Sequence, residues 1–95
     1  MSCNCNTLQK VSYVFKTYVN NEDITAEDCN AIEFINKGVS TVTINDLPLA
    51  TNESLSLSGN QRDIDQSSYS LNFGAGARQL VVIRKYLINS FGHGY

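Results

Sequence analysis

The chain has 95 residues, of which 42% are apolar and 17% are charged, and its formal net charge is −2. This length supplies one hydrophobic core, so we expect a single domain, and the apolar content argues against a disordered chain. The charge gives no basis for a nucleic-acid partner, since phosphate binding needs clustered lysine and arginine. The basic pair Arg84 and Lys85 is flanked by apolar residues and indicates the edge of a strand.

Residues 1–9 predict a short N-terminal arm. They lack the charged and apolar regions of a secretory signal, and the sequence contains no apolar stretch of the roughly 18 residues that a membrane-spanning helix needs. We therefore expect a soluble protein that is made in the cytoplasm and has no membrane partner. Cys3 and Cys5 are too close for a structural disulfide, which favours reduced thiols.

Residues 10–19 (KVSYVFKTYV) predict the first strand, because β-branched and aromatic side chains suit a pleated surface. Tyr13 shares parity with most apolar residues of this strand, so we expect it in the core. Tyr18 has the opposite parity and is expected to be exposed.

Residues 20–23 predict a turn. Residues 25–28 (TAED) predict a short helical turn, since a threonine followed three positions later by an acidic residue resembles a capping box.

The middle of the chain predicts three further short segments. Residues 31–35 and 40–44 have β-favouring compositions and flank a turn that contains glycine, which predicts a hairpin. Pro48 interrupts the next segment, because proline has no N–H to donate and is confined to edges and turns. Residues 54–58 (SLSLS) alternate strictly and predict a half-buried strand.

Residues 68–73 and 79–86 predict the last two strands. Three consecutive apolar residues at 81–83 indicate burial on both faces and a place at the centre of a sheet. The short strands and the lack of a helical period predict an all-β fold: a small antiparallel β-sandwich or barrel of about six strands over residues 10–86. Residues 87–95 predict a C-terminal tail.

Four side chains of the types that bind zinc occur in the chain, but their spacing matches no zinc knuckle. They are Cys3, Cys5, Cys29 and His93. We instead expect exposed thiols on the N-terminal arm, and Cys29 packed at the start of a strand.

Two other groups of polar residues are candidates for chemistry. Asn60, Asp63 and Asp65 form an oxygen-rich loop, but the loop lacks the central glycine and distal glutamate of an EF-hand, so we expect a structural turn. Ser90 and His93 have no adjacent orienting acid, and a flexible tail would not hold them in place for nucleophilic catalysis. We therefore expect no enzyme activity, no cofactor and no metal.

The tyrosines offer an alternative function, because an exposed tyrosine can stack on a sugar ring while its phenol bonds the hydroxyls. Tyr18 is the best candidate for that role by parity. The absence of tryptophan weakens this possibility. A carbohydrate- or surface-binding module is thus the alternative function, with a glycan as its ligand.

A recurring pattern runs through the central and C-terminal sequence. Its segments are INKG at 35–38, VTIN at 42–45, LATNES at 49–54, DQSSY at 65–69 and VIRK at 82–85. This pattern resembles small β-rich structural proteins of tailed phages that infect Bacteroidetes. The resemblance covers about half of the chain, and TNE at 51–53 stands where those proteins usually have Pro-Gly before the serine.

The resemblance implies a non-enzymatic virion component, such as a capsid decoration, head fibre, connector or tail part. Its partners would be other virion proteins and copies of itself. Terminal arms are suited to binding neighbouring subunits, because an extended segment covers a large surface for its mass. A frayed terminus is the plain alternative for the tail. The candidate partner-binding residues are Leu87, Ile88, Phe91, Tyr95 and Tyr18.

Overall fold

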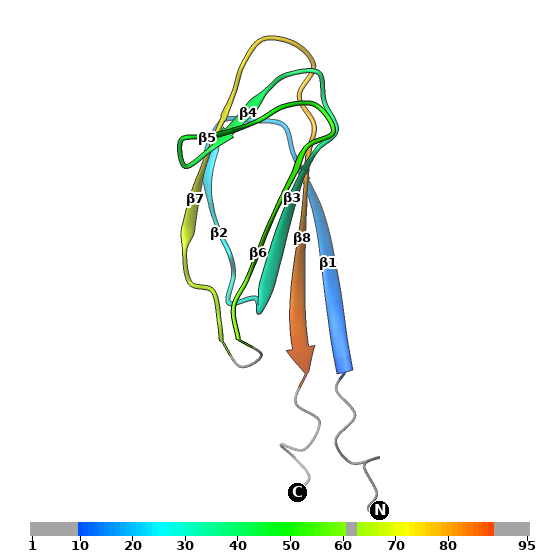
Figure 1. The fold of residues 1–95 in the computed structure, drawn as a ribbon, viewed down its shortest axis with the longest axis vertical. Coiled ribbons are helices and arrows are strands. Elements are labelled where there is room, and N and C mark those ends of the chain that lie inside the picture. Colours follow the sequence, from blue (N-terminus) through cyan, green and yellow to red (C-terminus); the bar gives the residue numbers. More distant parts are fainter. Residues whose placement is uncertain (1–9, 61–62, 89–95) are drawn as a thin grey trace, which may run out of the picture.

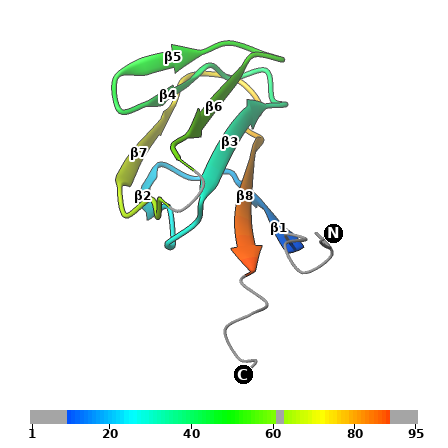
Figure 2. The ribbon, with the colours of Figure 1, turned by 60° about the horizontal axis from the view of Figure 1, so that its bottom comes forward.

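The computed structural model describes residues 10–60 and 63–88, which form eight strands and no helix. These strands make two antiparallel sheets, ordered β1-β8-β3-β6 and β2-β7-β4-β5, which pack face to face (Figures 1 and 2). The strands are β1 (Lys10–Tyr18), β2 (Glu22–Thr25), β3 (Ala31–Asn36), β4 (Val42–Ile44), β5 (Leu47–Leu49), β6 (Ser54–Ser58), β7 (Ser68–Phe73) and β8 (Leu80–Ile88).

The connections between the strands define the topology of this sandwich. Six of the seven connections pass from one sheet to the other, and only β4 and β5 are joined within one sheet. This order of eight strands in two sheets is that of a jelly roll. The expected all-β fold is confirmed, but it has eight strands instead of about six, and the sheets do not close into a barrel.

The core lies between the two sheets and follows the period-2 alternation of their strands. Along β7, for example, Tyr69, Leu71 and Phe73 are buried while the residues between them are not. The rings of Phe34 and Tyr69 meet edge to face across the core, with 5.0 Å between their centroids. Side chains from both sheets therefore interlock at the centre of the sandwich.

The sequence did not predict β2 and β5, the two edge strands of the second sheet. β2 is only four residues long and buries one of them, Ile24, so it has no detectable alternation. β5 contains Pro48, which sits at a sheet edge as expected of a residue without an N–H. The turn between β4 and β5 consists of Asn45 and Asp46, whose φ values of 47° and 72° are typical of a type I′ hairpin.

Two other local predictions are wrong. Residues 25–28 form no helix: Glu27 and Asp28 have φ values of 59° and 58°, which are left-handed and reverse the chain after β2. Strands β3 and β4 are not a hairpin, because they belong to different sheets. The intervening loop instead carries the chain across the top of the sandwich.

Asn36 stabilises the loop that connects β3 to β4. It is fully buried at the end of β3, and its side-chain amide donates hydrogen bonds of 2.8 Å to the carbonyls of Ser40 and Leu49. Its Oδ1 accepts a hydrogen bond from the Gly38 N–H at 3.0 Å. Gly38 leaves no room for a side chain, since a Cβ there would lie 2.6 Å from the carbonyl oxygen of Ala77.

The prediction that the last strand lies inside a sheet is confirmed, because β8 pairs with both β1 and β3. It runs to Ile88, two residues beyond the predicted end. Burial on both of its faces is not complete: Val82 is fully buried, whereas Val81 and Ile83 are half-buried. Arg84 does not mark a strand edge, because it lies on this inner strand and is 1% exposed.

Candidate functional site

Exposed apolar side chains gather on the edge strand β1. In the described part of the chain, β8 is its only strand neighbour. On the outer side, which faces away from the second sheet, Val11, Tyr13 and Phe15 are 43%, 53% and 66% exposed. On the inner side, Val14 is 45% exposed. The strand therefore presents apolar side chains to solvent on both faces.

The short strands of the second sheet explain this exposure. β2 has four residues whereas β1 has nine, and β1 and β8 continue below the lower end of β2 (Figure 1). Only Tyr18, at the upper end of β1, is buried, at 5% exposure. The predicted exposure of Tyr18 is therefore wrong, and so is the predicted burial of Tyr13.

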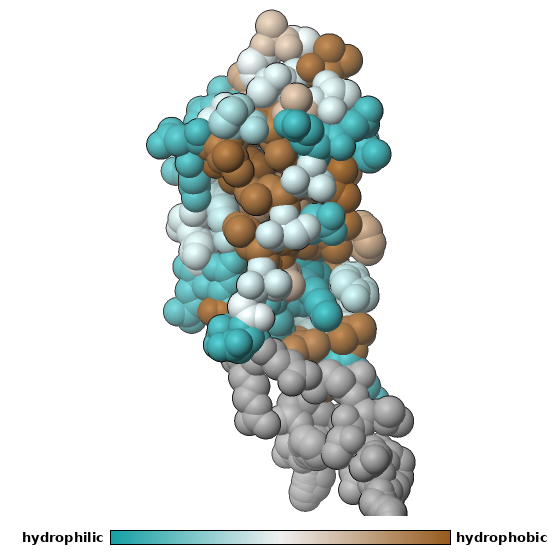
Figure 3. Space-filling model, in the orientation of Figure 1, coloured by the Kyte–Doolittle hydropathy of each residue, from teal (hydrophilic) through white to brown (hydrophobic). Residues whose placement is uncertain are grey.

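The outer apolar side of β1 continues onto β8. The register places Phe15 beside Ile83 and Val11 beside Leu87, and both β8 residues are half-buried. We call Val11, Tyr13, Phe15, Ile83 and Leu87 the β1–β8 surface. Figure 3 shows apolar surface at the lower ends of β8 and β1. Large contiguous apolar patches on a protein surface often mark a site of interaction.

A shallow hollow borders this surface beside Tyr13. Its polar lining comes from Glu33, Lys85, Ser56 and Ser58, which lie on β3, β8 and β6. An exposed phenol ring next to a carboxylate, an ammonium group and two hydroxyls can contact a ligand that has both apolar and hydroxyl-bearing faces. The hollow thus presents an aromatic ring and hydrogen-bonding side chains to solvent.

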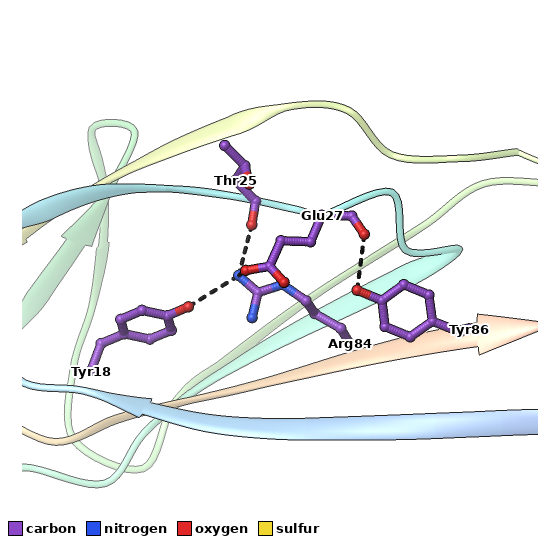
Figure 4. Close-up of polar contacts among 5 residues, drawn as sticks. All are labelled: Tyr18, Thr25, Glu27, Arg84 and Tyr86. Carbon is purple, nitrogen blue, oxygen red and sulfur yellow. Dashed lines mark hydrogen bonds and ion pairs between the residues drawn. The ribbon is translucent and has the colours of Figure 1, made fainter.

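A buried arginine ties β1 and β8 to the turn after β2 (Figure 4). Arg84 Nη2 donates to the Thr25 carbonyl at 2.7 Å and to the Tyr18 hydroxyl at 3.1 Å, and it lies 3.7 Å from Glu27 Oε2. The Tyr86 hydroxyl donates to the Glu27 carbonyl at 2.9 Å. These contacts fix the upper part of β1 against the sandwich.

The electrostatics of this cluster follow from its burial. The Glu27 side chain is 55% exposed, so its ion pair with Arg84 is partly solvated and the two hydrogen bonds of Arg84 matter more for stability. Burial, with a smaller contribution from the nearby Glu27 carboxylate, raises the pKa of Tyr86. Arg84 Nε has no hydrogen-bond partner among the described residues.

The oxygen-rich loop is held by local hydrogen bonds. Asp63 Oδ2 accepts from the Asn60 N–H at 2.9 Å, and Asp65 accepts from the Ser67 N–H at 2.8 Å and from the Tyr69 hydroxyl at 2.6 Å. Burial opposes ionisation of Asp65, but the hydrogen bonds from Tyr69 and Ser67 outweigh it and lower the pKa of Asp65. Burial and the bond to Asp65 raise the pKa of Tyr69 to about 12. This pattern is that of a structural turn.

Cys29 lies fully buried beside this turn, two residues before β3. Its carbonyl accepts a hydrogen bond from the Asp65 N–H at 2.7 Å, and burial raises the pKa of its thiol. The prediction that Cys29 packs at the start of a strand is confirmed. Across residues 10–60 and 63–88, no group of three or more His, Cys, Asp or Glu side chains is placed to hold a metal ion.

The structure places only some of the predicted partner-binding residues. Leu87 and Ile88 belong to β8, where they pair with Val11 and Lys10, so they are part of the sheet and not of a tail. Leu87 is half-buried and Ile88 is 46% exposed. Several candidates lie outside the described residues: Cys3, Cys5, Ser90, Phe91, His93 and Tyr95.

Sequence reasoning missed Val11, Tyr13 and Phe15 as surface residues because their alternation is the same as that of a buried face. One signal could have identified them. Val14 lies on the opposite face from Val11, Tyr13 and Phe15, so the strand has apolar residues on both faces. Lys10 and Lys16 lie on the same face as Val14. Lysines on an otherwise apolar strand are typical of a sheet edge.

Comparison with known proteins adds no relative: the chain matches no family model, no curated protein and no solved structure. No function is therefore carried over from a similar protein. Within residues 10–60 and 63–88, the structure contains no helix long and apolar enough to cross a membrane.

Proposed function

We propose that this protein is a non-enzymatic structural part of a phage particle and that it binds neighbouring subunits through the β1–β8 surface. Its place would be in the virion, as a capsid decoration, head fibre, connector or tail component, after synthesis in the host cytoplasm. The observation that carries the proposal is the exposure of Val11, Tyr13 and Phe15 on a strand that is apolar on both faces. Burying such a surface in a partner is favourable by about 25 cal/mol per Å² of apolar area.

The fold supports this proposal by analogy. Jelly rolls occur in viral capsid proteins and in lectin domains, although a fold alone does not specify a function. The resemblance of residues 35–85 to phage structural proteins favours the first of these two classes. The polar clusters around Arg84 and Asp65 support a non-enzymatic role, because their groups bond one another and the local backbone.

The test is incorporation into particles. Phe15→Lys places a charge on the β1–β8 surface, and Val39→Lys makes the same kind of change at a residue that is 70% exposed in the loop after β3. Particles would be assembled with each variant as the only source of the protein, and copies per particle counted by quantitative mass spectrometry. We expect Phe15→Lys to reduce incorporation at least about tenfold, which corresponds to a loss of about 1.4 kcal/mol. Val39→Lys should incorporate normally.

A shortened variant addresses the proposed contribution of Phe91 and Tyr95. Removal of residues 89–95 leaves β8 whole, whereas removal from Leu87 would cut its pairing with β1. We expect the shortened protein to fold and to incorporate less well. Absence of the unaltered protein from purified particles would contradict the proposal as a whole.

The hollow beside Tyr13 favours one second candidate, a carbohydrate-binding module. Tyr13 takes the role that parity assigned to Tyr18, since Tyr13 is 53% exposed and lines the hollow together with Glu33 and Lys85. A glycan array followed by calorimetric titration tests it. Tyr13→Ala should abolish binding and Val39→Ala should not. Equal binding by both variants would exclude this site.

A further inference from the structure

Among the described residues the sandwich has four edge strands, and two of them, β2 and β5, carry features that oppose pairing with another chain. β2 is four residues long and exposes Glu22 and Asp23, and β5 is three residues long and contains Pro48. β6 has serine at every second position, so its outer side is polar. Short edges, charges and proline are the devices by which proteins prevent edge-to-edge association. β1 is the longest of the four edges, with nine residues, and it exposes apolar side chains on both faces. Its edge charges are Lys10 and Lys16, so pairing along β1 must keep these lysines apart.

The backbone of β1 has a row of hydrogen-bonding groups directed away from β8. The Lys85 carbonyl and the Leu87 N–H bond Asn30, on the β3 side of β8, so the alternate residues of β8 bond β1. Arg84 lies opposite Val14, and the groups of Val14 are therefore engaged with β8. By alternation, the N–H and C=O groups of residues 11, 13, 15 and 17 point outward at the edge.

We propose that a second copy of this chain pairs with this edge, β1 against β1 in antiparallel orientation, about a two-fold axis perpendicular to the sheet at Val14. This deepens the proposed function by naming a partner. Pairing across that axis matches residue 10 with 18, 11 with 17 and 13 with 15, so both strands are used over their full length. Each outward-pointing residue then meets another, which gives four mutually hydrogen-bonded pairs.

This register also suits the side chains. On the outer side, Tyr13 of each copy meets Phe15 of the other, and aromatic cross-strand pairs stabilise a sheet. On the inner side, Lys16 meets Ser12 of the other copy. A two-fold axis at Tyr13 would instead place Lys10 opposite Lys16, and like charges directly opposite destabilise pairing. Pairing over the full strand length thus coincides with the register that separates the lysines.

Charge complementarity favours a second copy as the occupant. The two-fold axis leaves both second sheets on the same side of the joined sheet, and the upper half of one β1 lies along the lower half of the other. Lys10 of one copy then lies on the side that carries the exposed Glu22 of the other copy, which shares the inward parity of Ile24 on β2. The basic β1 of each copy therefore lies near the acidic β2 of the other copy, and the opposite charges favour this pairing.

Disulfide cross-linking tests the axis directly. Val14→Cys, in a background with Cys3 and Cys5 changed to serine, places two thiols across the axis in a pair whose Cα atoms are about 4.5 Å apart, within disulfide reach. We expect a covalent dimer on mild oxidation of the purified protein. Val11→Cys is the matched control, because the two thiols would lie about 20 Å apart along the strands. Equal cross-linking of both variants, or none of Val14→Cys, would overturn the proposed pairing.

Sedimentation of the purified protein without added cysteines gives the second readout. We expect a reversible dimer that Phe15→Lys weakens at least about tenfold and Val39→Lys leaves unchanged. A monomer at every concentration up to about 1 mM would reject the second copy as the partner. If such a monomer still entered particles through Phe15, the proposed function would stand with a different virion protein on the edge.

Discussion

Strands β1 and β8 lie side by side, have nine residues each and pair over their full length, yet they differ sharply in burial. In β8, Leu80, Val82 and Arg84 are at most 1% exposed. In β1, only Tyr18 is buried, and Phe15 is 66% exposed although its neighbour Ile83 is half-buried. Both strands are rich in β-branched and aromatic residues. The difference shows that place in the sheet, more than composition, decides which strand builds the core and which remains available to a partner.

The largest expected effect is on the buried side of this comparison. Leu80→Ala should lower the free energy of unfolding by about 3 kcal/mol, because it removes a fully buried side chain and leaves a cavity between the sheets. Val11→Ala, at a residue that is 43% exposed, should cost less than about 0.5 kcal/mol. Urea denaturation of both variants measures the two values. Similar losses would break the distinction between the strands.

A smaller effect is expected at Tyr18, which is the only residue of β1 that is buried as the core residues of β8 are. Tyr18→Phe keeps the buried ring but removes the hydroxyl that accepts a hydrogen bond from Arg84 at 3.1 Å. We expect a loss of about 1 to 2 kcal/mol, because Arg84 is buried and its Nη2 keeps only the Thr25 carbonyl as a hydrogen-bond acceptor. Tyr13→Phe is the matched control, and its hydroxyl should contribute nothing measurable. A neutral Tyr18→Phe would mean that the buried cluster does not anchor β1.

The smallest effect on folding is expected at Phe15. Phe15→Ala should change the free energy of unfolding by less than about 0.5 kcal/mol, since two thirds of this side chain is already exposed. The measurement must be made at low protein concentration, where a dimer does not add to the apparent stability. If the free energy of unfolding rises with protein concentration in the unaltered chain but not in Phe15→Ala, then Phe15 contributes to association and not to folding.

The strands with clear alternation are predictable from the sequence. β6 and β7 have the bounds that the sequence predicts, because SLSLS and SYSLNF alternate without exception. β2 and β5 are not predictable in this way, since four residues with one buried side chain and three residues around Pro48 carry no periodic signal. The segments that become β3 and β4 resemble a hairpin because nearby strands usually pair, and only the tertiary fold sends them to different sheets.

The candidate site is harder to predict than the fold. Alternation shows which residues of a strand share a face, but not whether another sheet covers that face. It therefore assigns Tyr13 and Tyr18 to opposite faces correctly and to the wrong environments. How much of the inner face of β1 is covered depends on the length of β2 in the second sheet. That length cannot be predicted from the sequence, because β2 has four residues, two of them acidic, and no periodic pattern.

The two-fold symmetry of the proposed pairing has a consequence for how far assembly can proceed. Each chain uses its β1 edge once, so this contact closes at two chains and leaves the five-residue β6 at both ends of the joined sheet. In the second sheet, the edges formed by the acidic β2 and by β5 with Pro48 do not favour added strands. Assembly beyond a pair would therefore need a contact of a different kind, through β6 or through the faces and loops of the sandwich.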